Sequence, residues 1–259
     1  MSLAAEAGAP RGPVPDAETP RGYERLPRTS EEMREVVKFY VASHPSAADP
    51  VRIRTFAGRL GAREAFLREA PRAGILYVGT HAEFETAPEA SLAGERPRGR
   101  RPNSSSRLSP ENRALELAPK ALCGIVLAGA NGPVGEDGRR PGFLTAEEVQ
   151  GLDLRHCRLV ILAVCDGNAG VPRDGQGIHS LVSAFHAAGA RTVVSTLWPV
   201  DDEHAQDFVE EFTRRVLEKG TPASKAFQDA RLTLYRRSSS TVRSWGPWIL
   251  SGDPDPFAD

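Results

Sequence analysis

Short apolar runs recur along the chain, and each of them is rich in β-branched residues. Four stand out: ILYVGT (75–80), GIVLAGA (124–130), RLVILAV (158–164) and RTVVSTLW (191–198). Their apolar residues are continuous rather than alternating with polar ones, which indicates strands that are covered on both faces. Segments with helical periodicity lie between these runs. The alternation therefore predicts an α/β fold in which helices cover both faces of a mostly parallel sheet.

Six segments carry apolar residues at helical spacing, namely 29–44, 61–72, 144–152, 177–190, 201–220 and 221–237. Thr29 or Ser30 is the expected cap of the first segment. Thr145 and Glu148 have capping-box spacing at the start of the third. Gly189 is the expected end of the fourth helix. One further segment, VRIRTFAG (51–58), alternates like a strand.

Composition divides the chain into a leader and one domain. Residues 1–24 are rich in Ala, Pro and Gly and have few large apolar groups to bury, so we expect a flexible leader. Residues 25–259 contain all the predicted strands and helices and form the predicted domain. Within this domain, residues 95–113 are rich in Arg and Ser and lack an apolar pattern. We expect them to be a flexible insertion.

Charge, hydropathy and cysteine content exclude several kinds of protein. The 259 residues carry a net charge of −1, whereas a duplex-binding protein needs a large basic excess. The chain has no apolar run of about 18 residues and no signal-peptide layout at its start, so we expect a cytoplasmic protein that does not bind membranes. The glycine-rich stretch 127–142 lacks the phosphate-loop pattern, which argues against a flavodoxin-like nucleotide-binding domain.

The three cysteines are Cys123, Cys157 and Cys165, which are too few and too scattered for a disulfide framework or a zinc site. His179 and His186 have no carboxylate cluster at metal-ligand spacing beside them. We therefore expect no metal and no organic cofactor.

Two of the predicted strands end next to a side chain that can do covalent chemistry. His81 follows ILYVGT, and Cys165 follows RLVILAV. The carboxyl ends of parallel strands form the edge of a sheet at which α/β proteins bind ligands. If the two strands are neighbours, a thiolate nucleophile has an imidazole beside it to move its proton. The alternative is that Cys165 is a core residue, because unpaired cysteines are often buried for packing.

Four blocks of the sequence resemble a CHAT domain and occur in its order. They are GILYVGTHAEFE, GFLTAEEVQGLDLRHCRLVILAVCDGNAG, AFHAAGARTVVSTLWPVDDEHAQDFVEEFTRRVLEKG and WGPWILSGD. The CHAT domain is the caspase-like cysteine peptidase domain of bacteria, often attached to tetratricopeptide repeats and related to separase, caspases and gingipains. The resemblance covers roughly residues 25–253 and implies a caspase-like fold.

The resemblance also implies roles for single residues. His81 matches the family's base and Cys165 its nucleophile. The backbone N–H groups of Ala82 and Cys165 match the oxyanion hole, although the family usually has glycine where this chain has Ala82. Asp166 keeps the acid that follows the nucleophile. The rest of the turn differs, because AVCDGN lacks the serine and the threonine that commonly surround the family's cysteine.

Three residues are expected to bind substrate: Asp202, Asp166 and Trp198. LWPVDDE is similar to a block of separase that contributes an acid to the pocket for the residue before the cleaved bond. An acid at Asp202 would favour Arg or Lys in the substrate. Two acids that open a helix are also good capping residues, so Asp202 has a purely structural alternative. Trp198 fits either a pocket wall or the core.

The expected function is that of a cysteine endopeptidase that uses a His81–Cys165 dyad to cleave a specific protein target, with a preference for basic residues. The expected partners are a protein or peptide substrate and a regulatory sensor or repeat protein in trans. The relatives implied by the resemblance act in bacterial defence or cell-death signalling. The alternative function is a catalytically inactive CHAT-fold module for protein interaction, which Ala82 and the altered turn favour.

Overall fold

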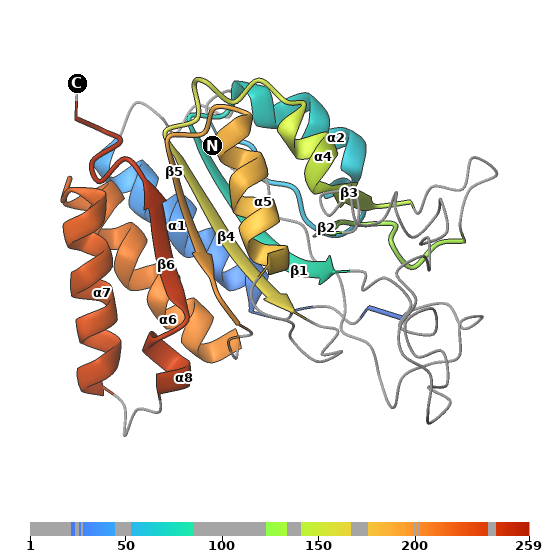
Figure 1. The fold of residues 1–259 in the computed structure, drawn as a ribbon. Helices are drawn as coiled ribbons and strands as arrows, with labels where there is room; N and C mark the ends of the chain where they lie inside the picture. The colour runs from blue at the N-terminus through green and yellow to red at the C-terminus, as the bar shows by residue number, and fades with distance from the viewer. Residues whose placement is uncertain are drawn as a thin grey trace, which may run out of the picture.

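A six-stranded sheet with helices on both faces forms the core of the molecule (Figure 1). This is a computed structural model, and it describes residues 22–23, 26, 28–44, 53–84, 123–133, 141–166, 176–198, 200, 202–237 and 242–258. Nearly all of the predicted leader and the whole predicted insertion at 95–113 lie outside these residues. The flexibility of both segments therefore stays a prediction.

The strand order of the sheet is β3-β2-β1-β4-β5-β6. The strands are β1 (Ile75–Phe84), β2 (Cys123–Val126), β3 (Phe143–Thr145), β4 (Leu159–Asp166), β5 (Thr192–Thr196) and β6 (Trp248–Gly252). β1, β4 and β5 form a parallel centre. β2 is antiparallel to β1 and β3 to β2, so β3 shares the direction of the centre, while β6 opposes β5. Four of the six strands therefore run the same way, which confirms the expected mostly parallel sheet.

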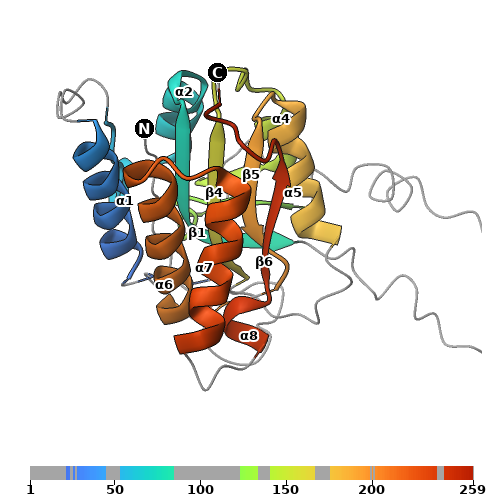
Figure 2. The same cartoon turned by 90° about the vertical axis from the view of Figure 1, so that its left-hand side faces the viewer.

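Helices cover the two faces of the sheet (Figures 1 and 2). One face carries α1 (Thr29–Ser43), α6 (Asp202–Thr213), the π-helical turn η5 (Arg214–Glu218) and α7 (Ala223–Arg237). The other face carries α2 (Arg63–Glu69), the short 3-10 turn η3 (Ala70–Arg72), α4 (Ala146–Gln150) and α5 (Gln176–Ala187). The 3-10 turn η2 (Gly58–Leu60) precedes α2, and α8 (Val242–Trp245) precedes β6.

Each face of the sheet has its own apolar core, because successive residues of a strand point to opposite sides. In β1, Leu76 and Val78 belong to the core beneath α5, whereas Ile75 and Tyr77 belong to the core beneath α1 and α6. β4 alternates in the same way, with Ile161 on the α1 and α6 face. This explains the continuous apolarity of the predicted strands, and it confirms that helices cover both faces.

Most predicted elements are present, with a few corrections. All four apolar runs contain strands, Thr145 and Glu148 form the capping box of α4, and Gly189 ends the α5 segment with φ 108°. The predicted strand at 51–58 is wrong: its described residues before η2 pair with no strand, and Phe56 packs on the core from an irregular segment. The cap predicted at Thr29 or Ser30 is also wrong, because the N-cap is Arg28 and no side chain caps the helix.

The short strands β3 and β6 and the helix α8 were not predicted. Among the described strands, β3 has three residues and pairs with β2 alone, and β6 has five residues and pairs with β5 alone. Both lie at the edges of the sheet, where pairing with a distant strand decides the structure more than the local pattern does.

Candidate functional site

The candidate site lies at the carboxyl ends of β1 and β4, in the middle of the sheet (Figure 1). After β1 the chain goes on to β2, on one side, and after β4 it goes on through α5 to β5, on the other side. The two connections therefore leave in opposite directions. Such a topological switch point opens a crevice between the strand ends, and it is the usual ligand site of α/β sheets.

The register of β1 and β4 brings the two predicted catalytic positions together. His81 is the direct partner of Cys165 in the parallel pairing, and Ala82 is the partner of Asp166. Neighbouring strands lie about 4.8 Å apart, so the backbones of His81 and Cys165 are separated by about that distance. The two-residue alternation puts position 81 on the face of Tyr77 and position 165 on the face of Ile161, which is the α1 and α6 face. Both positions thus share one face as well as one edge.

The side chains of Cys165, Asp166 and Asp202 lie outside the described part of the molecule, whereas their backbones lie within it. The backbone places Asp166 at the last position of β4 and Asp202 at the first position of α6. The expectation that Asp202 binds substrate rather than caps the helix stays a prediction.

The imidazole of His81 is deeply buried, with 1% of its surface exposed. The ring of Tyr23 stacks on it, with 6.1 Å between ring centroids and 29° between planes. The Tyr23 hydroxyl donates a hydrogen bond to the carboxylate of Glu83, which is also 1% exposed and lies two residues after His81 on the same strand. Tyr23 therefore covers the imidazole and binds the buried acid beside it.

The backbone of Tyr23 is fixed by Asn131. The Tyr23 N–H donates to Asn131 Oδ1 at 2.8 Å, and Asn131 Nδ2 donates to the Tyr23 carbonyl at 3.0 Å. The sequence did not indicate this contact, since Tyr23 lies at the end of the predicted leader and Asn131 lies in the glycine-rich stretch 127–142. The only local signal was a single aromatic residue in a stretch that is otherwise poor in large apolar groups.

A threonine at the end of β5 supports the end of β4. β4 and β5 pair as far as Ile161 and Val194, and beyond that point the Thr196 hydroxyl donates to the Val164 carbonyl at 3.3 Å. Val164 directly precedes Cys165. Thr196 is 2% exposed, so this bond is sheltered from water and helps to fix the backbone at the nucleophile position.

Ala82 lies within β1 rather than in a turn after it, because β1 continues to Phe84. It pairs with Ile125 of β2 on one side and with Asp166 of β4 on the other, and it is 3% exposed. The role of its N–H group in an oxyanion hole stays a prediction.

The residues after β5 run along the same edge of the sheet towards α8. Trp198 is half-buried, and its ring lies beside Gly246, between α8 and β6. The Leu197 N–H donates to the Pro247 carbonyl at 2.8 Å, which holds the two segments together. Of the two other tryptophans, Trp248 belongs to the core, where it stacks on Phe208 with 3.9 Å between ring centroids, and Trp245 is half-buried in α8.

The other two cysteines are packing residues. Cys157 is fully buried, and burial raises the pKa of its thiol to about 12. Cys123 is 2% exposed and lies in β2. A thiol with so high a pKa is a poor nucleophile at neutral pH, so Cys157 is unsuited to catalysis.

The described residues contain no group of His, Cys, Asp and Glu side chains that could hold a metal ion. His186 has a structural role, since its ring nitrogens contact the Ala190 carbonyl at 2.9 Å and the Ser251 hydroxyl at 3.0 Å. The side chain of His179 lies outside the described residues. Among the described helices, none is long and apolar enough to cross a membrane.

A comparison with protein-family models matches residues 6–253 to the CHAT domain. The match spans nearly the whole chain and includes every described strand and helix. A comparison with curated proteins gave no match.

Proposed function

The chain belongs to the CHAT domain family, whose fold is related to that of caspase-like cysteine peptidases, and we propose that it is a cysteine endopeptidase. In this proposal Cys165 is the nucleophile and His81 the general base. One observation carries it: the direct pairing of His81 with Cys165 at the switch point of the sheet. This register puts both positions on one face and at one edge of the sheet, as a dyad requires.

The proposed reaction has two steps. His81 takes the proton of the Cys165 thiol, and the thiolate attacks the carbonyl carbon of the scissile peptide bond. The tetrahedral intermediate collapses to a thioester as His81 gives the proton to the leaving amine. Water, deprotonated by the same imidazole, then hydrolyses the thioester and releases the acid and the thiol. Backbone N–H groups at Ala82 and Cys165 are the proposed donors to the oxyanion in both steps.

Asp202 and its neighbours are the proposed substrate pocket. Asp202 opens α6 directly after the segment that follows β5, which puts its backbone at the same edge of the sheet as the dyad. A carboxylate there would bind Arg or Lys at the residue before the cleaved bond through charge-assisted hydrogen bonds. Asp166 at the end of β4 and the half-buried Trp198 are the other proposed pocket residues.

A second candidate function is a non-catalytic CHAT-fold module for protein interaction. The burial of His81 favours it, because an imidazole that is 1% exposed does not reach the leaving amine of a bound substrate. The departures from the family pattern at Ala82 and around Cys165 favour it too. Under the peptidase proposal, the same burial means that the residues around the imidazole, Tyr23 among them, move before a substrate reaches it.

We propose that a partner controls this access. A sensor or repeat protein bound in trans, within bacterial defence or cell-death signalling, is the form of control that the family resemblance favours. The closed position of Tyr23 supports regulation in general, whereas the identity of the partner rests on the resemblance alone.

A positional-scanning library of fluorogenic peptides tests the proposal. Wild type is expected to cleave peptides with Arg or Lys before the reporter, and Cys165→Ala is expected to abolish this cleavage. Asp202→Ala is expected to reduce the preference for basic residues while leaving slow cleavage of other peptides. Cleavage that persists in Cys165→Ala would refute the assignment of the nucleophile, and a preference unchanged in Asp202→Ala would refute the pocket.

A further inference from the structure

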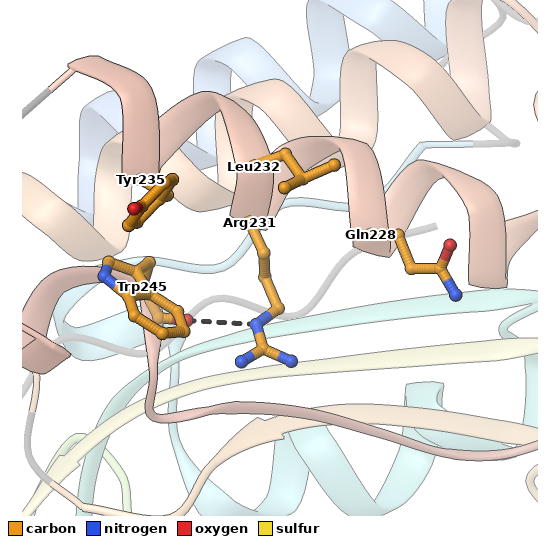
Figure 3. Close-up of a pocket in the computed structure, with 5 residues that line it drawn as sticks. All are labelled: Gln228, Arg231, Leu232, Tyr235 and Trp245. Atoms are coloured by element: carbon orange, nitrogen blue, oxygen red, sulfur yellow. Dashed lines mark hydrogen bonds between the residues drawn. The ribbon is translucent and has the colours of Figure 1, made fainter.

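A pocket of about 440 Å³ lies between α7 and α8, outside the candidate site (Figure 3). Five described residues line it: Gln228, Arg231, Leu232, Tyr235 and Trp245. The first four lie on α7, and Trp245 ends α8. Figure 3 shows the Arg231 side chain reaching from α7 towards Trp245, with the rings of Tyr235 and Trp245 next to each other.

Among the described residues, the lining of this pocket contains hydrogen-bond donors and no carboxylate. The Arg231 Nε donates to the Trp245 carbonyl at 3.2 Å. The guanidinium carbon lies 5.7 Å from the centre of the Phe227 ring and 5.5 Å from that of Trp245. Within the part of the chain that the structure describes, Arg231 forms no ion pair with an acid. Its charge and its two terminal nitrogens are therefore available to an anionic group.

Apart from the amide of Gln228, the remaining walls of the pocket are apolar or aromatic and are at least partly exposed to solvent. Leu232 is 47% exposed and Tyr235 is 56% exposed, and Val242 on the adjoining α8 is 58% exposed. Tyr235 and Trp245 meet edge to face, with 5.6 Å between ring centroids. An exposed apolar surface around a fixed cation fits a carboxylate that has apolar side chains beside it, since the cation supplies specificity and the rings supply contact area.

The charged residues at the end of α7 and in α8 all have the same sign. Arg236 and Arg237 end α7, and Arg243 lies in α8. All three are exposed. A cluster of cations of this kind attracts acidic segments and repels basic ones.

The pocket lies on the face and near the edge of the sheet that hold the dyad. α7 packs on the α1 and α6 face, which is the face of positions 81 and 165. Trp245 precedes Trp248, and Trp248 pairs with Thr196 at the carboxyl end of β5. β6 is the third strand from β1 across the sheet, so the two strands are about 14 Å apart. The helix layer lies about 10 Å above the sheet. An extended peptide of about six residues spans such a separation.

We propose that the α7–α8 pocket is a docking site for an acidic, apolar segment of the protein substrate, separate from the residues at the cleaved bond. This inference rests on the proposed peptidase function only where it identifies the bound protein as a substrate. The binding itself does not depend on it, because none of the five lining residues belongs to the candidate catalytic site. The segment bound in the pocket contains one Asp or Glu with Leu or aromatic residues beside it. The carboxylate of that acid accepts hydrogen bonds from the guanidinium of Arg231.

Fluorescence anisotropy with two labelled peptides tests the binding. The probes are twelve-residue peptides that carry the same Leu–Phe pair, flanked by Glu and Asp in one and by Lys in the other. They are titrated with Cys165→Ala protein, which cannot cleave them by the proposed reaction. The acidic probe is expected to bind, and the basic probe to bind at least tenfold more weakly.

Variants locate the binding. Arg231→Glu is expected to weaken the acidic probe at least tenfold, and Leu232→Ser several-fold. Because Leu232 is about half exposed and belongs to neither core, its substitution leaves the core intact. Lys219→Glu is the matched control, since it makes the same charge change at an exposed position outside the pocket. It is expected to change the affinity less than twofold. No binding of the acidic probe, or equal losses in Arg231→Glu and Lys219→Glu, would overturn the proposal.

A second assay separates this inference from the proposed function. A fluorogenic basic reporter is joined to the acidic segment by eight Gly/Ser residues, and its cleavage is compared with that of the free reporter. The joined reporter is expected to have a higher kcat/KM with wild type and no advantage with Arg231→Glu, while both proteins cleave the free reporter equally. If neither reporter is cleaved although the acidic probe binds, the binding site stands without peptidase activity, and the labelling of Cys165 then decides between a covered dyad and an interaction module. If joining gives no advantage, the pocket does not dock substrate.

Discussion

The reactivity of the three thiols towards iodoacetamide distinguishes a catalytic dyad from a packing cysteine. The perturbation is alkylation of the native protein at pH 7.5. Cys157 provides an internal reference, because it is fully buried and burial raises its pKa to about 12. Its thiolate fraction at pH 7.5 is therefore about 3 in 100,000. A thiolate paired with an imidazolium titrates at about pH 7 or below, so most of it is ionised at the same pH.

The expected ratio of rates follows from these fractions. The ionised fraction favours the dyad thiol by about four orders of magnitude. The intrinsic nucleophilicity of a thiolate rises with its pKa at a Brønsted slope of about 0.4–0.5, so the Cys157 thiolate is about two orders of magnitude more nucleophilic than the dyad thiolate. The net advantage expected for Cys165 over Cys157 is about 100-fold, before the burial of Cys157 and Cys123 is considered. Burial only increases this ratio.

The assay is peptide mass spectrometry after timed alkylation, with the three cysteine-containing peptides followed in the same sample. His81→Gln is the matched variant and is expected to slow Cys165 by at least tenfold without changing Cys157. Between pH 8 and pH 6, the dyad thiol is expected to slow about tenfold or less, whereas an ordinary thiol slows about 80-fold. Equal, slow labelling of all three thiols, or labelling of Cys165 that is unchanged in His81→Gln, would refute the dyad.

Three predictions concern stability. Glu211→Gln is expected to lower the free energy of unfolding by about 2 kcal/mol at pH 7 in urea titrations, since Glu211 is 5% exposed and bonds to Arg214 and Arg215. Burial raises the pKa of Glu211, but the two arginines outweigh burial and hold this pKa below the ordinary 4.5. The difference in unfolding free energy between wild type and Glu211→Gln should therefore shrink as the pH falls below 4.5 and disappear below the lowered pKa. A free-energy difference that grows in acid would contradict the argument. Thr145→Ala removes the capping box of α4 and is expected to lower the free energy of unfolding by about 1 kcal/mol, which corresponds to a fall of about 2–4 °C in Tm. An unchanged Tm would show that the cap adds no stability. Tyr23→Phe keeps the ring over His81 but removes the donor to the buried Glu83, so it is expected to cost about 1–2 kcal/mol in the same thermal assay; a neutral effect would mean that water replaces the hydroxyl.

The core of the sheet could be predicted from the sequence because its strands are buried on both faces. ILYVGT (75–80) and LVILAV (159–164) alternate between two cores, so each of their residues must be largely apolar or small, and such runs are recognised without knowledge of the fold. The edge strands β3 and β6 have no such signal. The burial of β6 decreases from Trp248 to Gly252, and its pairing with β5 is decided by the chain returning past α7 and α8.

The candidate site could be predicted in part. The ends of two buried strands indicated His81 and Cys165, and the register of β1 and β4 then brought them into direct pairing. The cover over His81 could not be predicted, since Tyr23 reaches Glu83 and Asn131 across long stretches of chain. The α7–α8 pocket could not be predicted either. Arg231 and Tyr235 are ordinary residues of an amphipathic helix until α8 places Trp245 beside them.

The burial of His81 makes access to the dyad the quantity that decides between the two candidate functions. Iodoacetamide is small and tests whether a thiolate and an imidazole are paired, whereas a peptide substrate also needs the space that Tyr23 occupies. Fast labelling together with cleavage means an open peptidase. Fast labelling without cleavage means a formed dyad that is covered, and an activator must then displace Tyr23. Slow labelling without cleavage means an interaction module. Three hydrogen bonds are among the contacts that hold Tyr23, one to Glu83 and two with Asn131, and the groups that form them can bond to water instead. Loss of these three bonds costs a few kcal/mol, which is within the range that binding of one partner supplies.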